Sequence, residues 1–223
     1  MRRAFPLVTA HSGCMGSPPN GAEHIALAIA SGADLVELDI RMAPDGRVVL
    51  AHDEDAALEE GILDLDRAFD LLEGEGSPVV NLDAKEPEAA LAAALIARAR
   101  GLEDSVLFSG LGPAETALMR ERIPRFRYLL NADSILPASG YGGYEIRAAC
   151  RMAAEHGCCG LNLEWSSASR ELMDYARLRC LPVLLWTVDA EDEMLEALEL
   201  GPYSLTTNRP DLLMRLLGKD QGR

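Results

Sequence analysis

The 223-residue chain is long enough for one globular domain, and 48% of its residues are hydrophobic although only 5% are aromatic. This composition excludes a disordered chain and indicates a core of leucine, valine, isoleucine and alanine. With 21 lysines and arginines against 36 aspartates and glutamates, the formal net charge is −15, which disfavours a general binder of nucleic acid or of anionic membranes.

The cysteines and the longest apolar runs indicate the compartment. The five cysteines are odd in number and form no Cys-x-x-Cys pair, which disfavours a disulfide framework or a zinc knuckle. The apolar run Ala4–Ala10 is too short for a signal peptide, and no run reaches the ~18 apolar residues of a membrane-spanning helix. We therefore expect a cytoplasmic protein without stable membrane association. The oligomeric state stays open.

Short runs rich in leucine and β-branched residues alternate with amphipathic runs along the chain. The strand-like runs are Phe5–His11, Asp34–Ile40, Arg47–His52, Pro78–Lys85, Ser105–Ser109, Arg127–Asn131, Gly160–Glu164, Leu181–Val188 and Tyr203–Thr207. The helix-like runs include Gly21–Ser31, Asp66–Glu73, Pro87–Arg100, Pro113–Arg122, Tyr144–His156, Ser169–Cys180, Glu191–Leu200 and Pro210–Leu217. This alternation predicts a parallel sheet covered by helices.

The second and third strand-like runs are too close together for a parallel pair. Only residues 41–46 separate them, and Pro44-Asp45-Gly46 is a strong turn signal. A parallel connection needs about a dozen residues or more, so we predict an antiparallel hairpin. The remaining eight strands predict an α/β fold of the TIM type, a (β/α)₈ barrel with an extra return strand after strand 2. We expect a single domain over residues 1–223, with a reduced insertion around 54–77.

Polar side chains gather where the predicted strands end, and active sites of such barrels lie at the carboxyl ends of the strands. These residues are His11, Glu37, Asp39, Asp83, Lys85, Ser109, Asn162, Glu164, Trp186, Thr187 and Asn208. Unpaired buried charge is costly, so a purely structural barrel would not need this set.

Three of these acids predict a metal site. Glu37 and Asp39 are two residues apart in one strand and therefore point to the same side, and Asp83 comes from the next barrel strand. Three carboxylates with water suit Mg²⁺ or Ca²⁺ better than zinc. A structural ion network, in which Arg41 or Lys85 pairs with the acids, is the alternative.

The hairpin brings His52 next to the strand that carries Glu37 and Asp39, and His11 ends the first strand. Two histidines beside a carboxylate cluster fit a general acid and a general base. Lys85 is a phosphate-binding cation or a counter-ion to Glu37 or Asp83. Trp186 forms an apolar wall for a substrate or packs in the core. His24 and His156 fall on predicted helices, and neither is assigned a function.

Short motifs along almost the whole chain resemble those of the glycerophosphodiester phosphodiesterase family. Thr9–Gly13 resembles its His-Arg-Gly opening, 32–40 its Gly-Ala-Asp…Glu-x-Asp strand, and 45–53 its Asp-Gly…Val-Val-x-His-Asp element. Residues 81–85 resemble its Glu-x-Lys strand, 185–189 its Trp-Thr-Val-Asn, and 205–210 its Thr-Asp-x-Pro.

The resemblance implies a divalent-metal enzyme of lipid metabolism that hydrolyses a glycerophosphodiester to an alcohol and glycerol phosphate. It implies that Glu37, Asp39 and Asp83 hold the metal, that His11 and His52 are acid and base, and that Lys85 neutralises phosphoryl oxygens. We also predict that Ser12, Trp186 and Glu164 contact the substrate.

The chain departs from the family pattern at several positions. Ser12 replaces the arginine after the first histidine, which removes a bidentate phosphate clamp. Pro18–Gly21 replaces Pro-Glu-Asn-Thr, which removes a carboxylate, and Asp83 and Asn208 replace glutamate and aspartate. Only residues 53–82 separate His52 from Asp83, so we expect a more open site.

These departures keep three alternatives open. The first is hydrolysis of another phosphodiester, such as a lysophospholipid headgroup. The second is a non-catalytic barrel that binds a phosphorylated ligand, although ligand binding alone does not need two histidines. The third is a sugar hydrolase with Glu37 and Glu164 as paired carboxylates.

Overall fold

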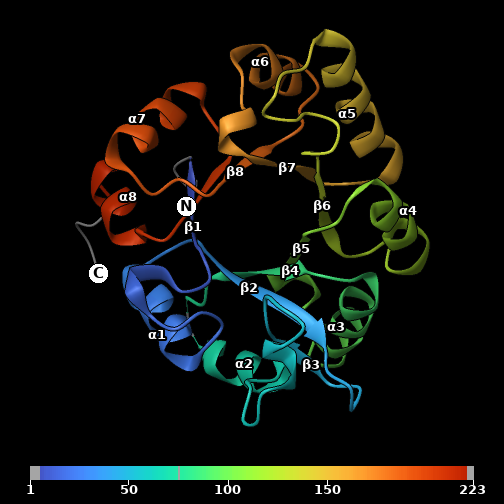
Figure 1. Ribbon diagram of the computed structural model, residues 1–223. Coiled ribbons are helices and arrows are strands. Elements are labelled where there is room, and N and C mark those ends of the chain that lie inside the picture. Colours follow the sequence, from blue (N-terminus) through green and yellow to red (C-terminus); the bar gives the residue numbers. More distant parts are fainter. Residues whose placement is uncertain (1–5, 75, 220–223) are drawn as a thin grey trace.

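The computed structural model describes residues 6–74 and 76–219, in which eight parallel strands close into a barrel (Figure 1). The barrel strands are β1 (Leu7–Ala10), β2 (Leu35–Met42), β4 (Val79–Ala84), β5 (Val106–Ser109), β6 (Arg127–Asn131), β7 (Gly160–Glu164), β8 (Val183–Trp186) and β9 (Ser204–Thr207). The ring closes where β1 pairs with both β9 and β2. The predicted TIM-type barrel is confirmed. Phe5, at the start of the first predicted strand, lies outside the described residues.

Helices surround the ring of strands, and each barrel strand is followed by one of them (Figure 1). They are α1 (Ala22–Ser31), α2 (Leu65–Leu72), α3 (Pro87–Ala99), α4 (Pro113–Arg122), α5 (Gly143–His156), α6 (Arg170–Leu178), α7 (Glu191–Leu200) and α8 (Pro210–Leu216). Short 3₁₀ turns are η1 (Cys14–Gly16), η2 (Ala56–Leu58), η3 (Glu103–Ser105) and η4 (Trp165–Ser167). Proline in the first turn of α3, α4 and α8 suits a helix start, since the missing N–H would have no helical partner there.

The predicted hairpin is also confirmed. Strand β3 (Val48–Leu50) lies outside the ring and pairs antiparallel with β2, with Ile40 opposite Leu50. The Ala51 N–H donates to the Asp39 carbonyl at 3.1 Å, so the chain stays beside β2 up to His52. The strand is shorter than the predicted Arg47–His52, which leaves His52 on the loop beyond it.

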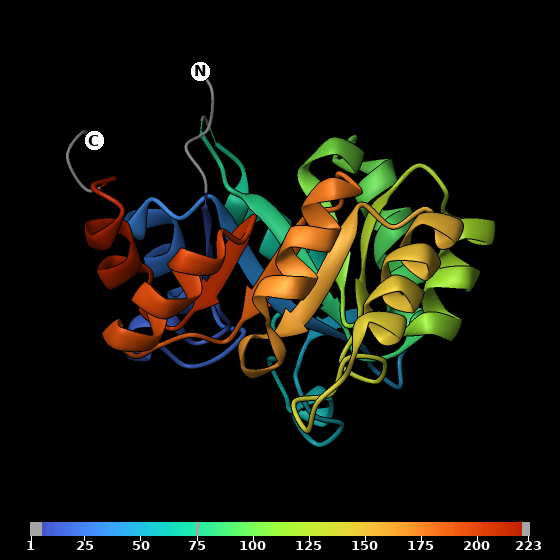
Figure 2. The ribbon, with the colours of Figure 1, turned by 90° about the horizontal axis from the view of Figure 1, so that it is seen from above.

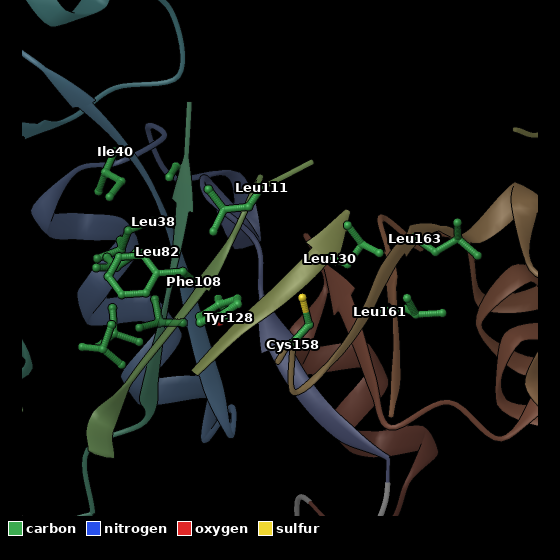
Figure 3. Close-up of a cluster of buried hydrophobic side chains, with 14 of the residues drawn as sticks. Leu38, Ile40, Leu82, Phe108, Leu111, Tyr128, Leu130, Cys158, Leu161 and Leu163 are labelled. Carbon is green, nitrogen blue, oxygen red and sulfur yellow. The ribbon is translucent and has the colours of Figure 1, made fainter. Parts of the chain in front are cut away.

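The outer faces of the strands and the inner faces of the helices form the main core. On β2, Val36, Leu38 and Ile40 point to the helices and are fully buried. Figure 3 shows Leu38 and Ile40 with Leu82 and Phe108 in this layer. Burying one such side chain contributes about 1.5–3 kcal/mol, so the outward residues of the strands stabilise the barrel.

The inside of the barrel is closed at one end and polar at the other. Leucines from five strands pack together as a floor: Leu7, Leu35, Leu107, Leu129 and Leu184. The next inward residues along these strands are Thr9, Glu37, Ser109, Asn131 and Trp186, so polar side chains predominate toward the carboxyl ends. The loops after β3 and β6 project from this same end of the barrel (Figure 2, bottom).

Candidate functional site

A cavity of about 230 Å³ lies at the carboxyl ends of the barrel strands. Its lining comes from strands around the whole barrel, from the loop after β3 and from the residues that follow the strands: His11, Glu37, Asp39, His52, Asn81, Asp83, Lys85, Ser109, Asn131, Asn162, Trp186, Thr187 and Thr206. The predicted strand-end polar residues are therefore largely gathered in one place.

Three acids meet on one side of this cavity. One carboxylate oxygen each from Glu37, Asp39 and Asp83 lie within 4.8 Å of one another. Glu37 and Asp39 are side by side because both point inward from β2, and Asp83 is the direct β4 partner of Asp39. The arrangement follows from strand register alone, which is why the sequence predicted it.

Neighbouring polar groups orient each of the two aspartates. Asn20 donates from Nδ2 to Asp39 Oδ2 at 2.8 Å and accepts from the Asp39 N–H at 3.0 Å. Ser109 donates to Asp83 Oδ1 at 2.7 Å. Gly110, at φ 77°, makes this close approach possible, because a Cβ there would collide with the Ala84 backbone and lie 3.0 Å from Asp83 Oδ1.

Lys85 lies between the two aspartates. Its Nζ is 2.6 Å from Asp39 Oδ1 and 2.6 Å from Asp83 Oδ2. Burial opposes the charged form of both Asp39 and Lys85, but opposite charges outweigh it: Lys85 lowers the pKa of Asp39, and Asp83 together with Asp39 raises the pKa of Lys85. Arg41, the other cation considered for the acids, pairs instead with Glu86 at 2.8 Å.

The pKa of Glu37 is shifted in the opposite direction from that of Asp39. It is 7% exposed, and burial, followed by the charges of Asp83 and Asp39, raises its pKa well above the usual range of a glutamate. The Ser12 N–H donates to Glu37 Oε2 at 3.4 Å, which only partly offsets this cost. Glu37 therefore takes up a proton more readily than an ordinary glutamate.

The two predicted histidines line the cavity and have different hydrogen-bond partners. His11 Nε2 is 3.6 Å from Glu37 Oε2, and its Nδ1 lies 2.9 Å from Asn208 Oδ1. His52 Nδ1 lies 2.8 Å from Asp53 Oδ1, and its side chain is 64% exposed against 34% for His11. In each ring the Nε2 atom is left for chemistry.

The opposite wall is neutral. Asn131 and Asn162 are hydrogen-bonded to each other through Asn162 Nδ2 and Asn131 Oδ1 at 3.1 Å. Asn81 Oδ1 and Trp186 Nε1 are buried and have no hydrogen-bond partner within residues 6–74 and 76–219. Asn81 lies on β4 beside Glu37, whereas Trp186 ends β8, and both residues line the cavity. The cavity therefore offers a polar ligand an acceptor on the side of the acids and a donor on the opposite wall.

Most predicted site residues are brought together, and two are not. His11, Glu37, Asp39, His52, Asp83, Lys85 and Trp186 line the cavity. The Ser12 side chain is buried outside it, and only the backbone N–H of Ser12 reaches Glu37. Glu164 is exposed and accepts from Ser166 Oγ at 2.9 Å. Because Glu164 does not line the cavity that contains Glu37, a sugar hydrolase based on that pair lacks structural support.

Sequence reasoning missed the role of Asn20. The replacement of the Pro-Glu-Asn-Thr motif predicted only the loss of a carboxylate, whereas the structure has the Asn20 side chain clamping Asp39 from a left-handed backbone conformation, φ 58°. The Pro-Asn-Gly sequence was the available signal, since asparagine tolerates this conformation better than most residues. Asn81, Asn131 and Thr206 are also lining residues that were not predicted.

The acid cluster fits a hard divalent cation. Its three oxygens come from rigid strand ends, the second oxygen of each aspartate is already hydrogen-bonded, and Lys85 is the positive charge between the aspartates. Carboxylate oxygens of this kind suit Mg²⁺ or Ca²⁺. The structure supports a possible metal site at Glu37, Asp39 and Asp83.

Residues 11–86 match the model of the glycerophosphoryl diester phosphodiesterase family. A search of the curated proteins gave no match. Among solved structures, a glycerophosphodiester phosphodiesterase from Thermotoga maritima is 19% identical with a TM-score of 0.74, covering 96% of this chain and 100% of that one. A phosphodiesterase from Oleispira antarctica, in complex with the product sn-glycerol-3-phosphate, is 18% identical with a TM-score of 0.77, covering 96% and 97%.

A further structure, a glycerophosphodiester phosphodiesterase from Parabacteroides distasonis, is 16% identical with a TM-score of 0.76, covering 97% of this chain and 98% of that one. Structural similarity at identities this low shows that the fold is shared. The family match covers residues 11–86, and this segment contains the three acids, both histidines and Lys85. The family match confirms the resemblance over residues 11–86, and the fold of the chain is that of these solved structures.

Among the residues that the structure describes, no helix is both long and apolar enough to cross a membrane.

Proposed function

We propose that the protein hydrolyses glycerophosphodiesters to an alcohol and glycerol 3-phosphate with the help of a divalent metal. The observation that carries this proposal is the meeting of two histidines, three carboxylates and one lysine in a single strand-end cavity. A binding site alone would not need two groups that exchange protons near neutral pH.

Glu37, Asp39 and Asp83 are the proposed metal ligands, and Mg²⁺ or Ca²⁺ the proposed ion. When bound, the ion polarises a phosphoryl oxygen and offsets its negative charge. Glu37 must be ionised to become a ligand, and its raised pKa, caused by burial and by the charges of the two aspartates, opposes this.

The two histidines supply opposite proton transfers. One Nε2 accepts the proton of the attacking hydroxyl, from water or from the substrate, as its oxygen bonds to phosphorus. The other Nε2 donates a proton to the alcohol oxygen as the P–O bond to it breaks. His52 is held by Asp53 and His11 by Asn208, each through Nδ1. The supports therefore direct both Nε2 atoms to the reaction.

Lys85 completes the charge balance. Its Nζ bridges Asp39 and Asp83 at 2.6 Å from each. A metal would compete for the same oxygens, which frees the ammonium group to donate to a phosphoryl oxygen. Lys85 thus serves as counter-ion in the free protein and as phosphate partner during the reaction.

The cavity favours a small polar substrate over a lysophospholipid. It measures about 230 Å³, and Trp186 is the one large apolar side chain among its described lining residues. The Oleispira antarctica relative was solved with sn-glycerol-3-phosphate as its product. A glycerol phosphate moiety is of the size and polarity that this wall of asparagine and threonine suits. Trp186 is proposed to pack against it.

We also propose that the protein works in the cytoplasm on such small phosphodiesters in lipid metabolism. All five cysteines are free thiols, and burial raises the pKa of Cys14 to about 11 and that of Cys158 to about 12. Buried, protonated thiols of this kind suit a reducing compartment.

The test is release of glycerol 3-phosphate from glycerophosphocholine and glycerophosphoethanolamine with Mg²⁺, Mn²⁺, Ca²⁺ or EDTA. We expect turnover with a divalent metal, none with EDTA, and a loss of about 10²–10⁴-fold in His11→Ala. Glu164→Gln is the matched control at a strand end outside the cavity and should retain full activity. Metal binding without turnover of either substrate would contradict the proposed substrate. Absence of both would favour the non-catalytic barrel.

A further inference from the structure

Two side chains that follow adjacent strands are linked to His11 by successive hydrogen bonds. Asn208 follows β9, and its Oδ1 lies 2.9 Å from His11 Nδ1. Asp189 follows β8, and its Oδ2 accepts from Asn208 Nδ2 at 2.8 Å. The sequence gives no sign of this contact, because His11 and Asn208 are 197 positions apart.

Asp189 is held firmly in place by further bonds. Its Oδ1 accepts from the Asn208 N–H at 2.7 Å and from Thr207 Oγ1 at 3.1 Å. Asn208 is tied to the opposite side as well, because its carbonyl accepts from the Met15 N–H at 2.8 Å. The Asp189 carboxylate and the Asn208 backbone therefore form one rigid unit beneath the His11 ring.

The chemistry of these groups sets the direction of every hydrogen bond. An ionised carboxylate only accepts, so the Asn208 edge that faces Asp189 must be the NH₂ group. The Asn208 oxygen must then face His11, which requires a proton on His11 Nδ1. A neutral His11 is thereby fixed with its lone pair on Nε2, toward Glu37 and the cavity.

We infer that Asp189 is a positioning residue that acts through Asn208 to select the Nδ1–H tautomer of His11. This inference rests on the proposed function for its kinetic consequence, while the tautomer itself is a property of the free protein. Without a carboxylate at 189, the Asn208 amide is free to turn and present its NH₂ group to Nδ1. A neutral His11 would then carry its proton on Nε2, and this atom could no longer accept one.

The test compares Asp189→Asn, Asn208→Asp and the double variant that exchanges both residues. The double variant restores an acceptor for His11 Nδ1 and a donor for that acceptor. Asp192→Asn, an exposed aspartate in the first turn of α7, is the matched control for the charge change. The tautomer of His11 is read from ¹⁵N chemical shifts in long-range ¹H–¹⁵N spectra of the metal-free protein at about pH 8, where an ordinary histidine is neutral. With four histidines in the chain, assignment by His11→Gln is direct.

We expect Nδ1–H in the parent protein, in the control and in the double variant, and a shift toward Nε2–H in Asp189→Asn. With Mg²⁺ present, kcat for glycerophosphocholine should fall about 10–100-fold in Asp189→Asn, as for other residues that orient a functional group, with little change in KM. The fall should be smaller in Asn208→Asp, because a carboxylate at 208 still accepts from His11 Nδ1. The double variant should recover most of the loss seen in Asp189→Asn. An unchanged His11 tautomer in Asp189→Asn, or a double variant no better than Asp189→Asn, would overturn the inference. If the parent protein turns over no glycerophosphodiester, the proposed function is wrong. The His11 tautomer in Asp189→Asn still tests whether Asp189 positions His11.

Discussion

The two halves of the barrel contribute different chemistry to one cavity. Among the lining residues that the structure describes, every charged or titratable group comes from residues 11–85, on β2 and β4, directly after β1 and β4, or in the loop after β3. Strands β5 to β9 and the residues directly after them contribute only Ser109, Asn131, Asn162, Trp186, Thr187 and Thr206. The family match at residues 11–86 coincides with the charged half.

The difference has a physical reason. Charges must lie within a few ångströms to bind one ion and one phosphate, and adjacent strands in register supply such spacing. In the proposed function, the neutral half faces the rest of the substrate, where hydrogen bonds and shape select the ligand at lower energetic cost. Substitutions in the charged half should therefore abolish turnover, while those in the neutral half should tune affinity.

The largest effect is expected from His52→Ala in the charged half. Loss of one proton-transferring group should lower kcat about 10²–10⁴-fold. The side chain is 64% exposed, so the melting temperature should hardly move. Steady-state assays with Mg²⁺ check this, with the exposed Asp55→Asn of the same loop as control. Near-normal turnover in His52→Ala would remove it from the reaction.

A smaller effect should follow from Ser109→Ala, where the neutral half touches the metal site. The hydroxyl orients Asp83 through a 2.7 Å hydrogen bond. Its loss should weaken metal binding about 10–100-fold, which is the usual cost of removing a partner of a ligand. Isothermal titration with Mn²⁺ measures this, and an unchanged affinity would show that the Ser109 hydroxyl does not orient Asp83 for the metal.

Metal affinity should also depend on pH, because the pKa of Glu37 is raised and the metal needs the ionised carboxylate. Affinity should rise with pH, by up to about tenfold per unit for one displaced proton, until Glu37 is ionised without metal. Titrations in buffers of different ionisation enthalpy count the released proton. Glu37→Gln should remove the proton release, and its persistence there would assign it to another group.

The same shift fixes the sign of the stability change in the metal-free protein. The folded state holds the Glu37 proton more tightly than the unfolded state, so this contribution is present below the usual glutamate pKa. It is lost as pH rises through the raised pKa of the folded state. The melting temperature should fall over that range, and saturating Mg²⁺ should reverse the fall.

The smallest effect is expected from Asn162→Ala in the neutral half. Losing one hydrogen bond, about 0.5–1.5 kcal/mol, should raise KM about two- to tenfold with kcat nearly unchanged. Comparing glycerophosphocholine with glycerophosphoethanolamine shows whether the residue also discriminates between alcohols. A large fall in kcat instead would contradict the proposed division of roles between the charged and the neutral half.

Periodicity predicted much of the fold and the charged half. The i, i+2 spacing of Glu37 and Asp39 and the short 41–46 turn lead directly to the acid cluster and the return strand. Periodicity gives the face of a strand but not the depth of a side chain. Glu164 has the same parity as Asn162 on β7, yet it lies at the strand's end, exposed and bonded to Ser166, instead of in the cavity.

Contacts between loops were beyond prediction. Asn20 meets Asp39, and Asn208 joins His11 to Asp189, through side chains whose positions depend on turns at several strand ends. A single sequence contains no signal for which amide turns toward which carboxylate. These neutral side chains set the orientation of the functional groups, and their positions are known only from the structure.

The most direct test of the division between the two halves is a crystal of the protein grown with Mn²⁺ and glycerol 3-phosphate, with diffraction recorded at the manganese absorption edge. We expect one anomalous peak bounded by carboxylate oxygens of Glu37, Asp39 and Asp83, with the phosphate beside Lys85 and the glycerol against the neutral wall. A crystal that binds glycerol 3-phosphate in the cavity with no manganese at these three acids would contradict the metal-dependent mechanism.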